Sequence, residues 1–322
     1  MTAAEHLALD IGDRVVLSIR MALADQKVRS VGVFIDPTLG DPLSDESAVQ
    51  EALKAGLLVR YSLPGIHDDI DPGASPYLLY APSEEPAERA ISATVRLAVA
   101  SVLEGDSPLS RPRAVCAWIV GDADPRARAA ALARLARVRR PDGEPWPLRF
   151  WDPRVLWHLP RVLPSEQWQS IESALGHWLT LDMDSYVKSF APSEGAEREV
   201  SSLHFDTVQW QRLQRIGAIN VALASAWEWG LLPTPRNAER IEELLATCEA
   251  LGFTSQRDGQ VFVACGLTSH DRFHQHPLVA AALQQAASKG EGAAPALTKF
   301  DETFWGELRQ HFFQAPVKQP KN

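Results

Sequence analysis

Residues 113–120 read RAVCAWIV, an apolar and β-rich run. A strand of this composition has both faces covered, so it predicts a sheet with packing layers on its two sides. Around this run, strand-like and helix-like patterns alternate: residues 28–35 are strand-like, and Ile91, Val95 and Val102 lie on one face of a helix. The alternation favours an N-terminal α/β lobe with a mixed sheet.

The second half of the chain has mainly helical patterns. Apolar residues recur at helical spacing over residues 205–229 and again over 235–251. Further helices are expected from about Pro277 and Phe300, and residues 260–265 form one strand-like piece. We therefore predict a mainly α-helical C-terminal lobe.

A polar stretch separates the two patterns. Residues 182–200 turn polar, and Pro192, Ser193 and Gly195 lie close together within them. Such clusters are typical of loops and domain boundaries. The predicted organisation is an α/β domain over residues 1–182, a linker over 183–200 and a helical lobe over 201–322.

The composition argues against several classes of protein. The 322 residues carry a formal net charge of −9, so no global positive field attracts nucleic acid or an anionic membrane. No apolar run is long enough to span a bilayer, and the N-terminal residues lack the pattern of a secretory signal. The cysteines, Cys116, Cys248 and Cys265, are widely spaced in apolar sequence, which favours buried thiols in a reducing compartment. We expect a cytoplasmic protein.

Familiar catalytic motifs are absent from the sequence. It contains no phosphate-binding loop, no dinucleotide-binding glycine pattern and no nucleophile elbow, so we predict no catalytic residue and no cofactor. The most metal-like cluster is His270, His274 and His276, of which the first two would share a helix face. Because Pro277 follows directly, a loop leading into a helix is favoured and no metal is predicted. A metal-dependent hydrolase built on these histidines is the alternative.

An arginine-rich segment offers a third interpretation. Residues 126–140 contain six arginines in a predicted helix. An acidic partner or RNA would suit such a surface, but a solvated helix face suits it equally and agrees with the acidic charge of the whole chain. We therefore expect no nucleic acid as partner.

Tryptophan is unusually abundant in the second part of the chain. Nine of the ten tryptophans lie after residue 145. Trp118 and Trp178 have core positions. The tryptophans that do not all fit the same buried stripes are Trp146, Trp151, Trp157, Trp210, Trp229 and Trp305. Because Trp is enriched at binding hot spots, these residues indicate contact surfaces, either for a partner or at a seam between the two lobes.

The most distinctive passage is PLRFWDPRVL at residues 147–156. Leu148 to Trp151 is predicted as a short strand, after which Asp152 caps a new helix with Pro153 at its first position. Arg149 and Arg154 flank the cap and are able to pair with its carboxylate or with a partner's. These residues either contact a partner or form a buried turn that fixes the strand-to-helix geometry, and the sequence leaves both alternatives open.

This passage resembles the signature of the type VI secretion effector-adaptor chaperones, the Tap/TEC family, in which an R-F-[YW]-D-P-R-[VL]-[LF] block follows a strand and precedes a helix. The resemblance continues in GVFIDP at residues 32–37, SPYLL at 75–79 and CAWIV at 116–120. It covers roughly residues 28 to 180. Trp151 replaces the common tyrosine of the family pattern.

The resemblance implies an adaptor and not an enzyme. Such adaptors bind a secreted effector in the cytoplasm and load it onto the spike protein of the type VI apparatus, so the effector and the spike protein are the expected partners. This task needs aromatic anchors on two contact surfaces. The residues that we expect to contact a partner are Arg149, Trp151, Asp152, Arg154, Trp157, Trp210 and Trp229.

Overall fold

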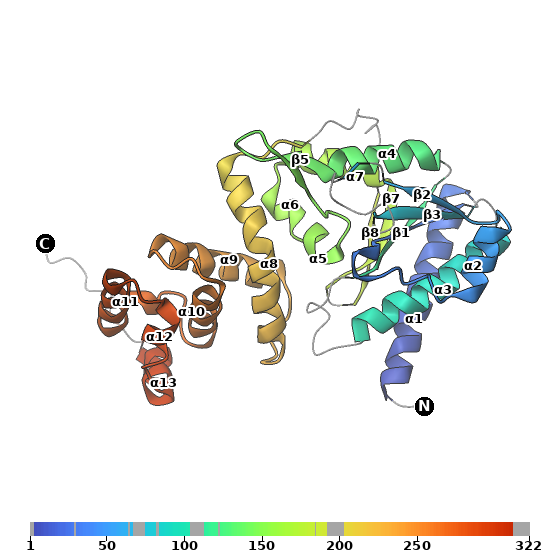
Figure 1. Ribbon diagram of the computed structural model, residues 1–322. Coiled ribbons are helices and arrows are strands. Elements are labelled where there is room, and N and C mark those ends of the chain that lie inside the picture. The colour runs from blue at the N-terminus through green and yellow to red at the C-terminus, as the bar shows by residue number, and fades with distance from the viewer. Residues whose placement is uncertain are drawn as a thin grey trace, which may run out of the picture. The chain divides into compact units, whose positions relative to one another are not determined.

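The computed structural model in Figure 1 describes most of the chain. The described residues are 3–28, 30–63, 65–66, 75–81, 84–103, 113–121, 123–183, 185–191 and 203–311. The chain divides into two compact units, Met1–Gln214 and Arg215–Asn322. The first contains a sheet with helices and the second is helical, so the predicted succession of an α/β lobe and a helical lobe is confirmed.

A six-stranded sheet forms the centre of the first unit. Its strands are β1 (Val31–Ile35), β2 (Val59–Ser62), β3 (Tyr77–Ala81), β4 (Val115–Val120), β7 (His177–Leu181) and β8 (Val187–Phe190). They lie in the order β2-β3-β1-β4-β7-β8, and every neighbouring pair is antiparallel. The sheet is thus antiparallel where the sequence analysis expected a mixed one.

The crossover connections explain this difference. Helix α2 (Ser47–Lys54) lies between β1 and β2 in the chain, and α3 (Glu84–Leu103) lies between β3 and β4. Each helix joins two strands of the same direction, as helical crossovers do. In both cases an antiparallel strand is inserted between the two: β3 separates β1 from β2, and β1 separates β3 from β4. The sequence pattern predicts the crossovers but not which strands become neighbours.

The two faces of the sheet belong to separate cores. In β4, Trp118 packs with α1 (Ala3–Gln26) and α3, whereas Ile119 packs with the helices on the opposite face. Figure 1 shows these helices on the other side of the sheet; they are α4 (Pro125–Ala136), α5 (Pro153–Leu156), α6 (Leu159–Val162) and α7 (Ser165–Leu175). Because all of β4 is buried, the prediction of a strand covered on both faces is confirmed.

Local signals set the helix ends. The carboxylate of Asp124 accepts hydrogen bonds from the backbone N–H groups of Arg126 and Ala127, and Pro125 occupies the first position of α4. Helix α7 ends at Gly176, whose φ of +65° favours glycine. Trp178, for which the sequence predicts a core position, lies buried in β7.

A two-stranded hairpin precedes the distinctive passage at residues 147–156. It consists of β5 (Arg137–Arg139) and β6 (Pro145–Pro147). Residues 148–151 were predicted as a strand, but they form a turn in which the N–H of Asp152 donates to the carbonyl of Arg149 at 3.1 Å. The strand ends at Pro147 instead.

Strand β8 lies inside the predicted linker. It pairs with β7, and its Phe190 is buried in the core. Residues 187–190 are therefore an edge strand; their Lys188 and Ser189 are polar, which explains why the composition suggested a linker. Residues 184 and 192–200 of the same segment lie outside the described residues.

The second unit contains α-helices and a short 3-10 helix within the described ranges. They are α8 (Thr207–Trp227, which begins in the first unit), α9 (Pro235–Ala250), α10 (Gln256–Thr268), η3 (Phe273–Gln275), α11 (Pro277–Lys289), α12 (Ala293–Leu297) and α13 (Glu302–His311). Residues 260–265, predicted as strand-like, lie in α10. Its Asp258 carboxylate accepts the backbone N–H of Ala294 at 2.7 Å and thereby fixes the start of α12.

Candidate functional site

Asp36, directly after β1, connects the predicted site residues to the sheet. Its side chain is fully buried. Oδ2 accepts hydrogen bonds from Arg149, with Nε at 3.1 Å and Nη2 at 2.7 Å, and from the indole N–H of Trp151 at 2.6 Å. Oδ1 accepts the backbone N–H of Thr38 at 3.0 Å and caps the short helix η1 (Pro37–Leu39). The carboxylate is thus compensated entirely by protein groups.

Trp151 and Asp152 lie in the interior. Trp151 is 1% exposed and stacks on Phe34 of β1, with ring centroids 5.3 Å apart. Asp152 is buried and caps α5 by accepting the backbone N–H of Arg154 at 3.0 Å; it also pairs with Nη2 of Arg154 at 2.7 Å. The predicted cap at Asp152, followed by Pro153, is confirmed.

Arg113 lies behind this turn and is almost fully buried. Its guanidinium donates to the carbonyl oxygens of Leu181 and, at 3.0 Å, of Asp182 at the end of β7. Burial lowers the pKa of Arg113 to about 10, and the nearby carboxylates of Asp152 and Asp182 oppose this change. Buried charges near the turn are therefore compensated within the fold.

This arrangement limits what residues 149–154 present to a partner. Trp151 and Asp152 contact the core, and 16% of the Arg154 side chain is exposed. Arg149 is the most accessible residue of the set, with 37% of its side chain exposed. Trp157 is half-buried, and its ring meets that of His158 edge-on at 4.8 Å. The geometry favours a structural task for the turn, and partner contact stays a prediction.

Trp210 belongs to an aromatic cluster at the surface of the first unit. Its ring meets the ring of Trp146 edge-on at a centroid distance of 5.6 Å, and the Arg140 guanidinium lies 5.5 Å and 5.9 Å from the two ring centroids. Trp146 is 47% exposed. We call Trp146, Trp210 and Arg140 the Trp146 cluster. Both tryptophans are among those that indicate contact surfaces in the sequence, whereas Arg140 was not predicted as a contact residue.

Trp229 lies in the second unit and is 55% exposed. Leu232, close to it in the chain, is 60% exposed. The predicted site residues are thus distributed over a buried turn and the Trp146 cluster in the first unit and over the segment after α8 in the second.

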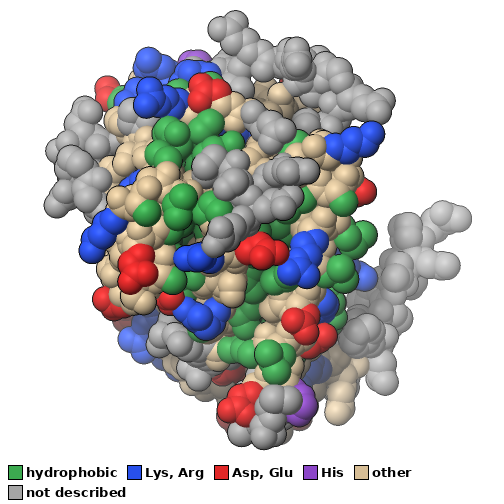
Figure 2. Space-filling model, turned by 90° about the vertical axis from the view of Figure 1, so that its right-hand side faces the viewer, with side chains coloured by type: hydrophobic (Ala, Val, Ile, Leu, Met, Phe, Trp, Pro, Cys, Tyr) green, Lys and Arg blue, Asp and Glu red, His purple; other side chains and the backbone are tan. Residues whose placement is uncertain are grey.

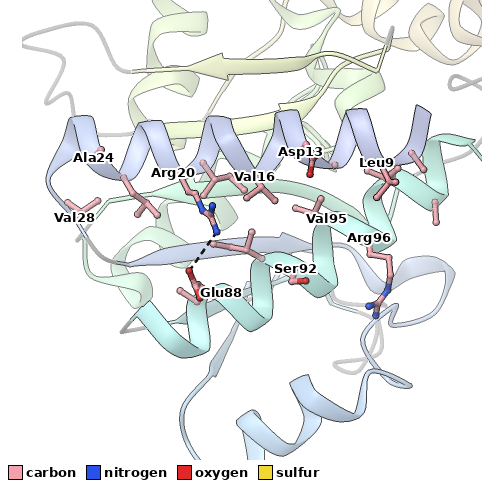
Figure 3. Close-up of a pocket in the computed structure, with 18 of the residues that line it drawn as sticks. Leu9, Asp13, Val16, Arg20, Ala24, Val28, Glu88, Ser92, Val95 and Arg96 are labelled. Carbon is pink, nitrogen blue, oxygen red and sulfur yellow. Dashed lines mark ion pairs between the residues drawn. The ribbon is translucent and has the colours of Figure 1, made fainter. Parts of the chain in front are cut away.

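A groove between α1 and α3 was missed by the sequence analysis. It has a volume of about 1310 Å³ and its lining is mainly apolar. Figure 3 shows side chains from both helices along it, with an ion pair between Arg20 and Glu88. A signal was available, because Leu9, Val16 and Leu23 line the groove at intervals of seven residues.

The three histidines of the alternative hypothesis contact different neighbours. His270 Nδ1 accepts the backbone N–H of Arg272, His274 lies beside the ring of Phe262, and His276 meets Phe304 edge-on at 5.3 Å. Within the described ranges, no group of three or more His, Cys, Asp or Glu side chains is arranged to hold a metal ion. The positions of these three histidines give no support to a metal-dependent hydrolase built on them.

Comparison with known protein families gives a match in the first unit. The family model for a domain of unknown function, DUF4123, matches residues 68–170. The matched segment includes β3, α3, β4, α4 and residues 149–154, and it ends inside α7. No curated protein and no solved structure matches the chain. In the part of the chain that the structure describes, no helix is both long and apolar enough to cross a membrane.

Proposed function

We propose that this protein is a cytoplasmic adaptor that binds a secreted effector of the type VI apparatus and loads it onto the spike protein. In this proposal the protein is not an enzyme and needs no cofactor. Its working parts are surfaces that bind polypeptides.

Two observations on the sequence support the proposal. The passage at residues 147–156 resembles the adaptor signature, and the DUF4123 match covers the whole passage. The resemblance at GVFIDP, residues 32–37, now has a structural counterpart, because Asp36 accepts hydrogen bonds from Arg149 and Trp151. The two parts of the signature thus form one unit.

The Trp146 cluster is the observation that carries the binding function. Interface hot spots are enriched in Trp and Arg, which supply large contact areas and directed hydrogen bonds. Here Trp146 is exposed, while Arg140 lies over both indole rings. Arg140 also pairs with Asp142 at 2.8 Å. Arg149, Trp157 and Trp229 are proposed as further contacts.

The test is co-purification of the full chain with defined partners. The tagged protein is co-expressed with a type VI effector toxin and a spike protein from the same genome, each alone and both together. We expect a stable complex with the toxin and a ternary complex with both. Binding to neither protein would refute the adaptor function.

Elemental analysis of the same preparation addresses the alternative. A stoichiometric content of zinc or iron, lost together with stability on chelation, would favour the hydrolase built on His270, His274 and His276. We expect no such content.

A further inference from the structure

We propose that an exposed arginine surface of the first unit binds an acidic segment of a polypeptide partner. This inference rests on the proposed adaptor function and specifies the chemistry of one contact. The surface lies on α4 and β5, in the segment where the sequence contains six arginines. We call it the arginine surface, and its members are Arg126, Arg134, Arg137 and Arg139.

The structure separates the exposed arginines of this segment from those with a place in the fold. Arg128 donates to the carbonyl oxygen of Leu175 at 2.8 Å, and burial lowers its pKa. Arg140 belongs to the Trp146 cluster. The remaining four are exposed. Figure 2 shows Lys and Arg side chains, in blue, that gather at the top of the first unit, where Figure 1 places α4.

The arginine surface lacks the ion pairs that other exposed arginines of the first unit form. Arg60 pairs with Asp41 at 2.5 Å, and Arg96 pairs with Glu46 at 2.6 Å. Among the described residues, no guanidinium of the arginine surface pairs with a carboxylate. Because carboxylates form strong, bidentate hydrogen bonds with a guanidinium, a partner that carries them has four unpaired sites to bind.

Backbone contacts hold two members in place. Arg137 donates to the carbonyl oxygen of Gly65, and Arg139 donates from Nη1 to that of Gly143 at 2.9 Å. Each guanidinium has five N–H donors, so most of them stay available to a partner. Val138 between the two arginines is buried, which places both of them on the outer face of β5.

Positive charge is concentrated in this part of an acidic chain. Residues 125–147 contain six arginines and two acidic residues, which gives a net charge of +4, whereas the whole chain carries −9. The rest of the chain therefore carries −13. Like charges gathered on one surface repel one another, and carboxylates of a bound segment would relieve this repulsion. Charge complementarity thus selects an acidic occupant.

The side chains between the arginines favour a polypeptide over a nucleic acid. On the outer side of α4, Ala127 and Ala130 lie between Arg126 and Arg134. Proteins bind single-stranded nucleic acids through aromatic side chains on which the bases stack, and alanine offers no such platform. Small side chains instead allow a second helix to approach closely. The charge of −13 on the rest of the chain also repels a nucleic acid.

The experiment compares two charge-reversal variants of the full chain. Arg126→Glu/Arg134→Glu changes side chains that form no hydrogen bond within the described ranges. The matched control is Arg236→Glu/Arg257→Glu, at exposed residues without a described ion pair in the first turns of α9 and α10. Both variants change the net charge from −9 to −13, so a difference between them is not an effect of total charge. Both should keep the thermal midpoint of the wild type.

The probe is a fluorescent, alanine-rich helical peptide of about 16 residues with glutamate at every fourth position. Alternate glutamates are then about 12 Å apart along the helix, which is also the separation of Arg126 and Arg134 along α4. At about 0.1 M salt, the wild type should bind this peptide at least about tenfold more tightly than a peptide with glutamine in place of glutamate. Arg126→Glu/Arg134→Glu should weaken binding at least about fivefold, and the control variant less than about twofold.

Three results would overturn the proposal. The first is equal affinity for the glutamate and glutamine peptides, and the second is an equal effect of the two double variants. The third is a single-stranded RNA of the same charge that binds more tightly than the glutamate peptide and loses binding in the arginine variant. That result would identify a nucleic acid as the occupant.

Acidic residues of the chain itself are the competing occupant. Asp68, Asp69 and Asp71 follow closely after Gly65, which accepts the hydrogen bond from Arg137. If Asp68→Asn/Asp69→Asn/Asp71→Asn binds the glutamate peptide at least about tenfold more tightly than the wild type, these residues fill the arginine surface and the proposal fails. We expect less than about a twofold change.

The effector and the spike protein separate this inference from the adaptor function. If either protein binds the Arg126→Glu/Arg134→Glu variant as tightly as the wild type and the other does not bind at all, the inference fails while the adaptor function stands. If neither protein binds the wild type but the glutamate peptide does so with the expected loss in the arginine variant, the adaptor function fails. The arginine surface then stands as a site for acidic segments.

Discussion

Trp151 donates its indole N–H to the carboxylate of Asp36 at 2.6 Å, although the two residues are 115 positions apart in the sequence. Arg149 reaches the same carboxylate oxygen. The contact joins the end of β1 to the turn before α5, so two passages that resemble an adaptor signature separately are one structural unit.

Replacement of Asp36 by alanine should destabilise the protein by about 2–4 kcal/mol, because the buried indole N–H of Trp151 loses its acceptor and Arg149 loses its counter-charge. Urea unfolding at neutral pH measures this change. Asp142→Ala is the control: Asp142 pairs with Arg140 at the surface, where both side chains are substantially exposed, so its loss should cost less than about 1 kcal/mol. Equal costs for the two variants would contradict the structural task of Asp36.

Trp151 and Trp178 form a matched pair for testing the hydrogen bond alone. Both are buried and both contact Phe34, but Nε1 of Trp178 has no hydrogen-bond partner in the described structure. Trp151→Phe should therefore be more destabilising than Trp178→Phe by about 1–3 kcal/mol, the contribution of a hydrogen bond to a charged group. Denaturant midpoints of the two variants compare them directly. Similar losses would mean that packing alone holds Trp151.

The features predicted correctly from the sequence are those with a local cause. The cap at Asp152 involves its side chain and the next few backbone N–H groups, so the short pattern contains all the information. The incorrect predictions concern segments whose sequence pattern fits more than one secondary structure. Residues 260–265 are a short apolar run with two valines and a phenylalanine, which suits a strand or a buried helix, and they lie in α10.

The candidate sites were harder to predict because they depend on distant contacts. No local pattern indicates that Trp146 in a hairpin meets Trp210 at the start of α8. The heptad of Leu9, Val16 and Leu23 is visible in the sequence. Whether these residues line a groove depends on α3, which packs beside α1.

Stability should fall in alkaline solution because the buried thiols resist ionisation. Burial raises the pKa of both Cys248 and Cys265 from 9 to about 12, and it also raises the pKa of Cys116 and of Tyr77. Since the folded state keeps these protons longer than the unfolded state, their stabilisation is complete below about pH 9 and decreases between about pH 9 and pH 12.

Urea unfolding from about pH 8 to about pH 10.5 measures this decrease. The Cys248→Ala/Cys265→Ala double variant should show a shallower dependence on pH than the wild type, whatever its stability at neutral pH. Parallel curves for the two proteins would contradict the assignment. In the native wild type at neutral pH, a thiol reagent should react slowly with Cys265, which is partly exposed, and more slowly with Cys116, which is buried.

Trp146 should contribute to partner binding without contributing much to stability. Nearly half of its side chain is exposed, and Trp210 and Arg140 hold it in place, so truncation removes contact area but leaves the core unchanged. Trp146→Ala should weaken binding to the co-purifying toxin or spike protein about tenfold or more, as measured by titration calorimetry.

Leu57→Ala is the control, because Leu57 is equally exposed at 47% and lies outside the cluster. We expect less than about a twofold change for Leu57→Ala and a change in unfolding free energy below about 1 kcal/mol for both variants. Unchanged affinity of Trp146→Ala for both partners would place the adaptor's contacts elsewhere on the molecule.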